Sequence, residues 1–156
     1  MNAEHPTPQN GWDIASLTAL FASDPASLGD VDVDIKDDVL FVTVKEKGDL
    51  VVSIVAAEDQ LRASILLVEE SQVPASAEFN RALLTLHKAI PLSTFGITTV
   101  DNASWYELFG ALSSSCSADN VVEEVAALVA NAGETAEWLS EWSQQHGATG
   151  RNGEKE

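Results

Sequence analysis

The sequence has very little cysteine. Cys116 is the only one among 156 residues, so the chain can form no internal disulfide and no zinc site made of several thiolates. A chain that relies on no disulfides is typical of a reducing compartment. We therefore expect a cytoplasmic protein.

Basic residues are scarce as well. Eight Lys and Arg stand against 25 Asp and Glu, which gives a formal net charge of −17. A surface of this charge repels phosphate groups, so nucleic acid and anionic lipid surfaces are poor candidates for a partner. A protein with a basic segment would be attracted instead, although acidity can also serve solubility alone.

Long hydrophobic runs and phosphate-binding loops are missing. The apolar stretch 50–57 is much shorter than the ~20 residues that span a bilayer, and residues 1–10 lack the basic and apolar segments of a signal peptide. We expect no membrane insertion. Neither G-x-G-x-x-G nor G-x-x-x-x-G-K occurs, and no His or Cys spacing suits a metal, so the sequence predicts no cofactor and no metal site.

The apolar residues that are present are enough for one core. Hydrophobic residues make up 45% of the chain, and 156 residues correspond to about one domain. We expect a single domain over 11–146. The proline-containing residues 1–10 and the small, charged residues 147–156 are predicted to be disordered tails.

Hydrophobic periodicity predicts an α+β protein. Period-two runs separated by short turn signals predict antiparallel hairpins, and the apolar run 50–57 predicts a central strand covered largely on both faces. The predicted order is α-β-β-β-β-α-β-β-α, with helices packed on an antiparallel sheet. The elements are a helix at about 12–22, strands at 31–35, 39–46, 50–57 and 61–70, a helix from Pro74 to Pro91, strands at 93–100 and 104–112, and a helix from about 119 to 145.

The stretch GDVDVDIKDDVLF, residues 29–41, raises the question of a calcium loop. Counted from Asp30, an EF-hand loop needs Gly at its sixth position and Glu at its twelfth, and this chain has Ile35 and Phe41 there. The aspartates alternate with apolar residues, which is the pattern of a strand with one solvated face. We predict a strand and no calcium site.

Candidates for catalysis are few. His87 is the only histidine outside the predicted tails and their borders, and Cys116 precedes the last helix, whose dipole could lower its pKa. Neither has a visible catalytic partner, and a structural role is the simpler interpretation of both. A small enzyme or ligand-binding domain that uses Cys116, His87 and carboxylates is kept as the alternative hypothesis.

Two groups of aromatic residues and glycines are candidates for partner binding. Trp138 and Trp142 lie one helical turn apart and either form an apolar patch or pack on the protein's own sheet or first helix. Two strand glycines flanked by phenylalanines predict a shallow apolar groove. The residues of this predicted groove are Phe95, Gly96, Phe109 and Gly110.

The segments AIPLSTFGI (89–97), WYELFGALS (105–113) and VVEEVAALVANA (121–132) carry a family resemblance. With the acidic strands before them, they resemble the YjfI-like family of small bacterial cytoplasmic proteins, over about 12–145. The resemblance implies no catalytic residues. It implies a partner or regulator, because genes of this family tend to lie beside that of a phage-shock-protein-A-like membrane-remodelling protein.

The order of elements is also similar to that of class I type III secretion chaperones, which are small, acidic, dimeric proteins that hold protein segments. We therefore predict a non-enzymatic protein-binding module of the chaperone or adaptor kind, whose partner carries a basic segment. We also predict a homodimer, since sheet edges and apolar helix faces need cover. Its predicted interface is the helix face with Leu83, Leu86 and Ile90.

Overall fold

The computed structural model describes the backbone of residues 5–153 and the side chains of residues 5–147. Six antiparallel strands form one sheet in the order β1-β2-β3-β4-β6-β5. The predicted α+β class and order of elements are confirmed. In chain order the elements are α1 (Ile14–Ala22), β1 (Val31–Lys36), β2 (Val39–Val44), β3 (Leu50–Ala57), β4 (Gln60–Glu69), α2 (Ser76–Leu86), β5 (Thr94–Val100), β6 (Ala103–Ser113) and α3 (Ala118–Gly153), with short 3-10 turns at Lys45–Lys47, Glu70–Gln72 and His87–Ala89.

Two of the hairpins turn on acidic and amide residues. Asp37 and Asp38 join β1 to β2, and Asp101 and Asn102 join β5 to β6, all four with positive φ. Two left-handed residues in a row are the conformation of a type I′ turn, whose twist matches that of the strands it joins. Asp and Asn tolerate this conformation better than other residues with a side chain, which is why both turns were predicted correctly from the sequence.

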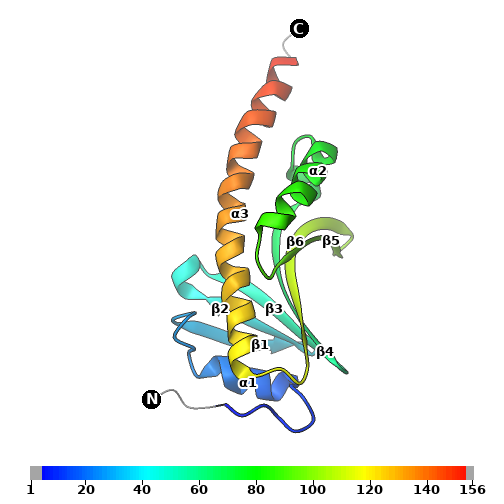
Figure 1. The fold of residues 1–156 in the computed structure, drawn as a ribbon. Helices are drawn as coiled ribbons and strands as arrows, with labels where there is room; N and C mark the ends of the chain where they lie inside the picture. Colours follow the sequence, from blue (N-terminus) through cyan, green and yellow to red (C-terminus); the bar gives the residue numbers. More distant parts are fainter. Residues whose placement is uncertain (1–4, 154–156) are drawn as a thin grey trace.

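The main core lies between the sheet and the helices α1 and α3. Figure 1 shows α3 crossing the sheet with α1 near its first turns. The apolar stripe of α3 faces this core, and its members are at most 5% exposed. The buried apolar residues of the two helices are Leu17, Leu20, Phe21, Val121, Val125, Leu128, Val129 and Ala132.

A second, smaller core holds α2 against the C-terminal half of α3. Phe79 of α2 is 1% exposed and lies edge-on to Tyr106 of β6, with ring centroids 5.0 Å apart. Trp138 of α3 stacks on the same Phe79 ring at 5.1 Å. The Tyr106 hydroxyl donates to the side-chain carbonyl of Asn80, so α2 is fixed to the sheet by a polar contact too.

The predicted end of the last helix is wrong. The helix continues past 145 to Gly153. The φ of Gly147 is not positive, so this glycine does not form the left-handed cap that ends many helices. Residues 1–4 and 154–156 of the two predicted tails lie outside the described residues. Within residues 5–10, the Thr7 hydroxyl donates to the Cys116 carbonyl.

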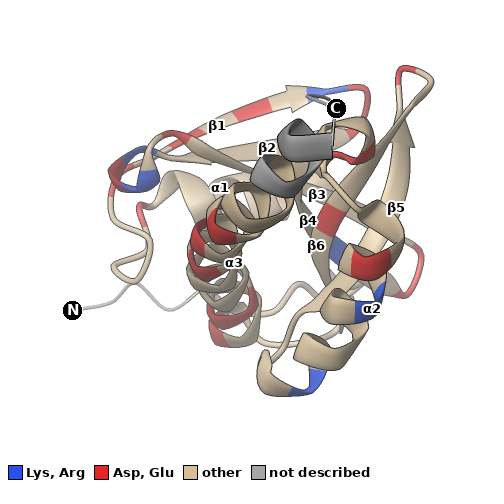
Figure 2. Ribbon diagram, turned by 90° about the horizontal axis from the view of Figure 1, so that it is seen from above, with Lys and Arg blue, Asp and Glu red and all other residues tan. Residues whose placement is uncertain are grey.

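Charge is distributed unevenly over the helices. Figure 2 shows acidic residues along α3 on the side away from α2, whereas α2 carries one residue of each sign, Glu78 and Arg81. None of the helices within residues 5–153 has both the length and the apolarity needed to cross a bilayer.

Candidate protein-binding surfaces

One face of the sheet has no helix over it within residues 5–153. Figure 2 shows the three helices together on the other side. Residues paired directly across antiparallel strands share a face. The pairings Phe41 with Ser53, Ser53 with Ser64 and Ser64 with Phe109 therefore place these side chains in one row on the uncovered side. We call this surface, together with Val51, Val55 and Leu66, the open face.

Apolar side chains are exposed at the centre of the open face. Val51 and Val55 of β3 are 42% and 41% exposed, and Leu66 of β4 is 42% exposed. The prediction that β3 is covered largely on both faces is therefore wrong, because β3 is central in the sheet but covered on one side only. The apolar run of β3 therefore reflects two surfaces: one side of the strand packs in the core, and the other side forms part of the exposed open face.

Charged residues border this apolar centre. Asp32 and Asp34 of β1 pair with Thr43 and Phe41, so they lie on the open face at one edge of the sheet. Lys45 approaches Asp32 at 3.2 Å, and the hydrogen bond raises the pKa of the lysine. The strand predicted for this stretch is confirmed, with its carboxylates on the solvated side as the period of two indicated.

Glu107 lies within the open face and is affected by burial. It faces Gly96 across the β5–β6 ladder and Leu66 across the β4–β6 ladder. Burial raises the pKa of Glu107, and the positive charge of Arg62 partly offsets that rise. A carboxyl group of this kind can accept a hydrogen bond or a cation from a partner that covers the face.

The predicted groove between β5 and β6 is not formed. Phe95 pairs with Leu108 and packs against the core on the helix side, whereas Gly96 and Phe109 lie on the open face. Gly110 points to the helix side again. The four residues are thus split between the two faces, because successive residues of a strand point in opposite directions.

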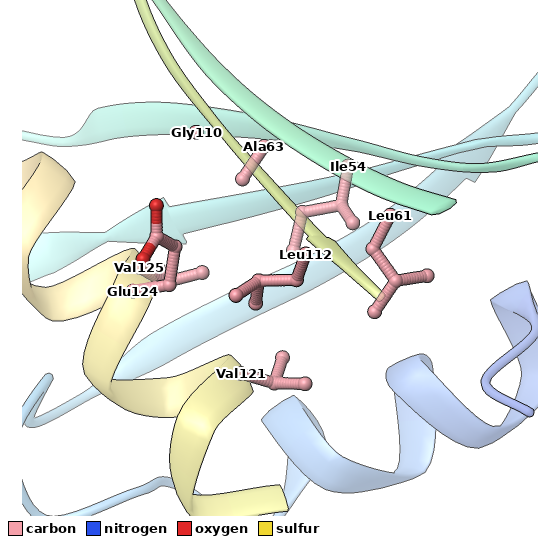
Figure 3. Close-up of a pocket in the computed structure, with 8 residues that line it drawn as sticks. All are labelled: Ile54, Leu61, Ala63, Gly110, Leu112, Val121, Glu124 and Val125. Atoms are coloured by element: carbon pink, nitrogen blue, oxygen red, sulfur yellow. The ribbon is translucent and has the colours of Figure 1, made fainter. Parts of the chain in front are cut away.

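Gly110 makes room for a buried carboxyl group. A Cβ atom added to Gly110 would lie 2.0 Å from Oε1 of Glu124, and Figure 3 shows the Glu124 side chain pointing toward this glycine. Glu124 is 7% exposed, and burial raises its pKa, with a smaller contribution from Glu123. The adjoining apolar cavity, about 10 Å³, has room for about one water molecule.

The two tryptophans of α3 take different positions. Trp142 donates its Nε1–H to the carbonyl of Pro74 at 2.9 Å and stacks on His146 at 3.7 Å. Trp138 lines a cleft of about 420 Å³ between α2 and α3. The pair packs on Phe79 of α2, and not on the first helix with Trp12. The other residues that line this α2–α3 cleft are Glu78, Arg81, Ala82, Thr85 and Leu86.

The residues predicted for a dimer interface do not form one surface. Leu83 is 4% exposed and belongs to the second core, while Leu86 and Ile90 are half-buried. Leu84, which the prediction did not include, is 71% exposed. The helical period was correct, but the stripe it identified faces the protein's own aromatic residues.

Cys116 and His87 are not brought together. The Cys116 carbonyl accepts a hydrogen bond from Trp12 at the start of α3, and burial raises the pKa of its thiol, which lowers the thiolate fraction. His87 follows α2 and lies edge-on to Phe95, with ring centroids 6.0 Å apart. Because Phe95 pairs with Leu108, His87 lies beside a part of β6 that is eight residues before Cys116 in the chain.

By its architecture the protein is a small α+β domain, with three helices on one side of a six-stranded antiparallel sheet. The crystal structure of YbjN from E. coli, which has been proposed to be a transcription regulator, shares this fold. It superposes with a TM-score of 0.53 at 10% sequence identity, over 78% of this chain and 91% of YbjN.

The chain belongs to a bacterial family described as an uncharacterized protein conserved in bacteria, DUF2170, whose model matches residues 11–143. The proteins YjfI of Escherichia coli strain K12 and of Escherichia coli O157:H7 are each 30% identical to it over 132 residues. That match covers 85% of this chain and 98% of each YjfI protein. The family resemblance seen in the sequence is confirmed.

Proposed function

We propose that this protein is a non-enzymatic protein-binding module of the adaptor or chaperone kind, and that the open face is its binding surface. The observation that supports this proposal is the exposure of Val51, Val55 and Leu66 on one face of two neighbouring central strands. Central strands normally bury such residues, and an uncovered apolar surface bordered by polar residues is typical of an interaction site.

The partner proposed for this surface carries a basic segment beside apolar side chains. The apolar side chains would cover the centre of the open face, and Lys or Arg would approach Asp32 and Asp34 at its edge. The net charge of −17 would attract such a segment from a distance and raise the rate of association.

The cellular setting is proposed from the family. A cytoplasmic role beside a phage-shock-protein-A-like partner follows from the resemblance to the YjfI-like proteins. The role proposed for YbjN as a regulator is compatible with a protein that acts through protein contacts, because the acidic surface of this chain repels nucleic acid. The alternative of a small enzyme gains no support from the separate environments of Cys116 and His87.

The proposal is tested with one charged substitution and a matched control. Leu66→Lys places a charge at the centre of the open face, whereas Ile35→Lys alters a residue of similar exposure, 49% against 42%, on the opposite side of the sheet. The wild type and both variants are used for affinity purification from native cells, with quantitative mass spectrometry. The purified phage-shock-protein-A-like protein is then titrated against each of them.

We expect a protein that is retained by the wild type and by Ile35→Lys and is lost with Leu66→Lys. Thermal unfolding of both variants shows whether the loss reflects binding or folding. A partner that binds all three forms equally would show that the open face is not the binding surface.

A further inference from the structure

The two edges of the sheet are protected very differently. β1 carries Asp32, Asp34 and Lys36 along its six residues, and charges on an edge strand oppose pairing with another chain. β5, with the sequence TFGITTV, has no charged residue among its seven. β6 is the one element with which β5 shares an extensive contact within the described residues, so the other side of β5 is free for a further strand.

Exposed apolar side chains gather around this uncharged edge. Ile97 and Val100 of β5 are 51% and 36% exposed, and Leu92, just before the strand, is 56% exposed. Together with Leu84 they make up half of the large apolar residues found exposed in the described chain. The β5 edge thus combines free strand pairing with exposed apolar area and no charge, whereas β1 carries three charged residues.

Leu84 of α2 lies near the β5 edge because of the way α2 is turned toward the sheet. Positions 80, 84 and 87 share one side of a helix. Asn80 accepts a hydrogen bond from Tyr106 of β6, and His87 lies against Phe95 of β5. The side of α2 that carries Leu84 therefore faces the β5 end of the sheet.

We propose that β5 pairs with β5 of a second copy of this chain, antiparallel, to form a twelve-stranded sheet across two subunits. A two-fold axis perpendicular to the sheet makes the interface self-complementary. Directly paired residues point to the same side of a sheet, so the axis must lie between one residue of the strand and the same residue of the other copy. Ile97 lies at the middle of Thr94–Val100 and is placed opposite its own copy.

The charge of the chain argues for a second copy as the occupant. Two copies with a net charge of −17 each repel one another, and the repulsion is smallest where the contact itself is uncharged. Pairing through β1 would instead bring Asp32 and Asp34 of both copies together, which is destabilising. A basic strand from another protein would find no carboxylate on β5 itself to pair with.

The proposal does not rest on the open face as a binding surface. Pairing at the edge leaves the open face of each subunit uncovered, so a failure of either proposal leaves the other standing. It also assigns to the β5 edge the self-association that the sequence predicted for α2.

Sedimentation of the purified full chain tests the assembly. The wild type is expected to be a dimer at micromolar concentration. Ile97→Lys, which brings two ammonium groups together at the axis, is expected to be a monomer, and Ile35→Lys on the other edge, 49% exposed, is expected to remain a dimer. Circular dichroism of each variant confirms that it is folded.

A cysteine cross-link tests the register. Cα atoms of directly paired residues lie about 4.5–5.5 Å apart, within the range that a disulfide can bridge. In a Cys116→Ser background, Ile97→Cys is expected to form an intersubunit disulfide under mild oxidation, and Ile35→Cys is not. A monomeric wild type, or a dimer that Ile97→Lys leaves intact and Ile97→Cys does not cross-link, would overturn the proposal. So would a monomer that takes up a strand of another protein at β5.

Discussion

At the scale of single residues, Glu124 is the clearest case of a group whose burial has a measurable consequence. Its folded-state pKa is raised above the unfolded value, so the folded state favours the neutral carboxyl group. Stability is then highest below the unfolded pKa of about 4.3 and falls as the pH rises through the folded pKa.

We predict that Glu124→Gln stabilises the protein at neutral pH by about 1 kcal/mol, because the amide has the same shape and no charge to bury. Below pH about 4 the gain should vanish, since the wild-type carboxyl group is then neutral in both states. Urea unfolding at the two pH values measures the difference. Glu123→Gln, at an exposed neighbouring position, should change the stability much less. A destabilised Glu124→Gln would mean that the charged carboxylate makes a favourable contact.

Gly110 is predicted to be intolerant of a side chain. The added Cβ of Gly110→Ala would lie 2.0 Å from Oε1 of Glu124, so α3 or the carboxyl group must move, which costs about 1–3 kcal/mol by analogy with overpacked cores. Gly96→Ala should cost less, because its closest neighbour is the ring of Phe109 at 3.0 Å on the open face. Combining Gly110→Ala with Glu124→Ala should restore part of the loss. Equal losses for the two glycines in thermal unfolding would contradict this account.

At the scale of elements, α2 depends on α3 for its position. Trp142→Ala removes both the tilted ring contact with Phe79 and the hydrogen bond to Pro74. We predict a loss of roughly 2 kcal/mol, below the 3–5 kcal/mol of a fully buried ring, since Trp142 is half-buried. Trp142→Phe should lose about half of that, because it keeps an aromatic contact.

The location of this loss can be measured as well. Amide hydrogen exchange in Trp142→Ala should become faster in Ser76–Leu86 and stay unchanged in Ile14–Ala22, because α1 packs on the other core. Uniformly faster exchange would indicate that the two cores unfold as one unit.

The elements also show what local sequence can and cannot specify. The turns at 37–38 and 101–102 and the stripe of α3 were predictable, because turn chemistry and helical period depend on residues close together in the chain. The partner of α2 was not, since the contact of Phe79 with Trp138 joins segments far apart in sequence. The groove predicted between β5 and β6 was wrong for a local reason, because alternation along each strand already places Phe95 opposite to Gly96 and Phe109 opposite to Gly110.

At the scale of the whole molecule, the net charge of −17 acts in opposite directions on the two interactions proposed here. A basic partner is attracted by this charge, whereas a second copy is repelled by it. Dissolved salt screens both effects over a Debye length of ~10 Å at 0.1 M. We therefore predict that added salt weakens binding of the basic partner and strengthens self-association through β5.

Sedimentation of the wild type at low and high salt measures the second effect, and a titration with the captured partner at the same two concentrations measures the first. Ile97→Lys serves as a control for the titration, because it removes self-association without altering the open face. If both interactions weaken with salt, ion pairs hold the dimer together and the uncharged β5 edge is not its interface. If neither responds, the acidic surface serves solubility alone.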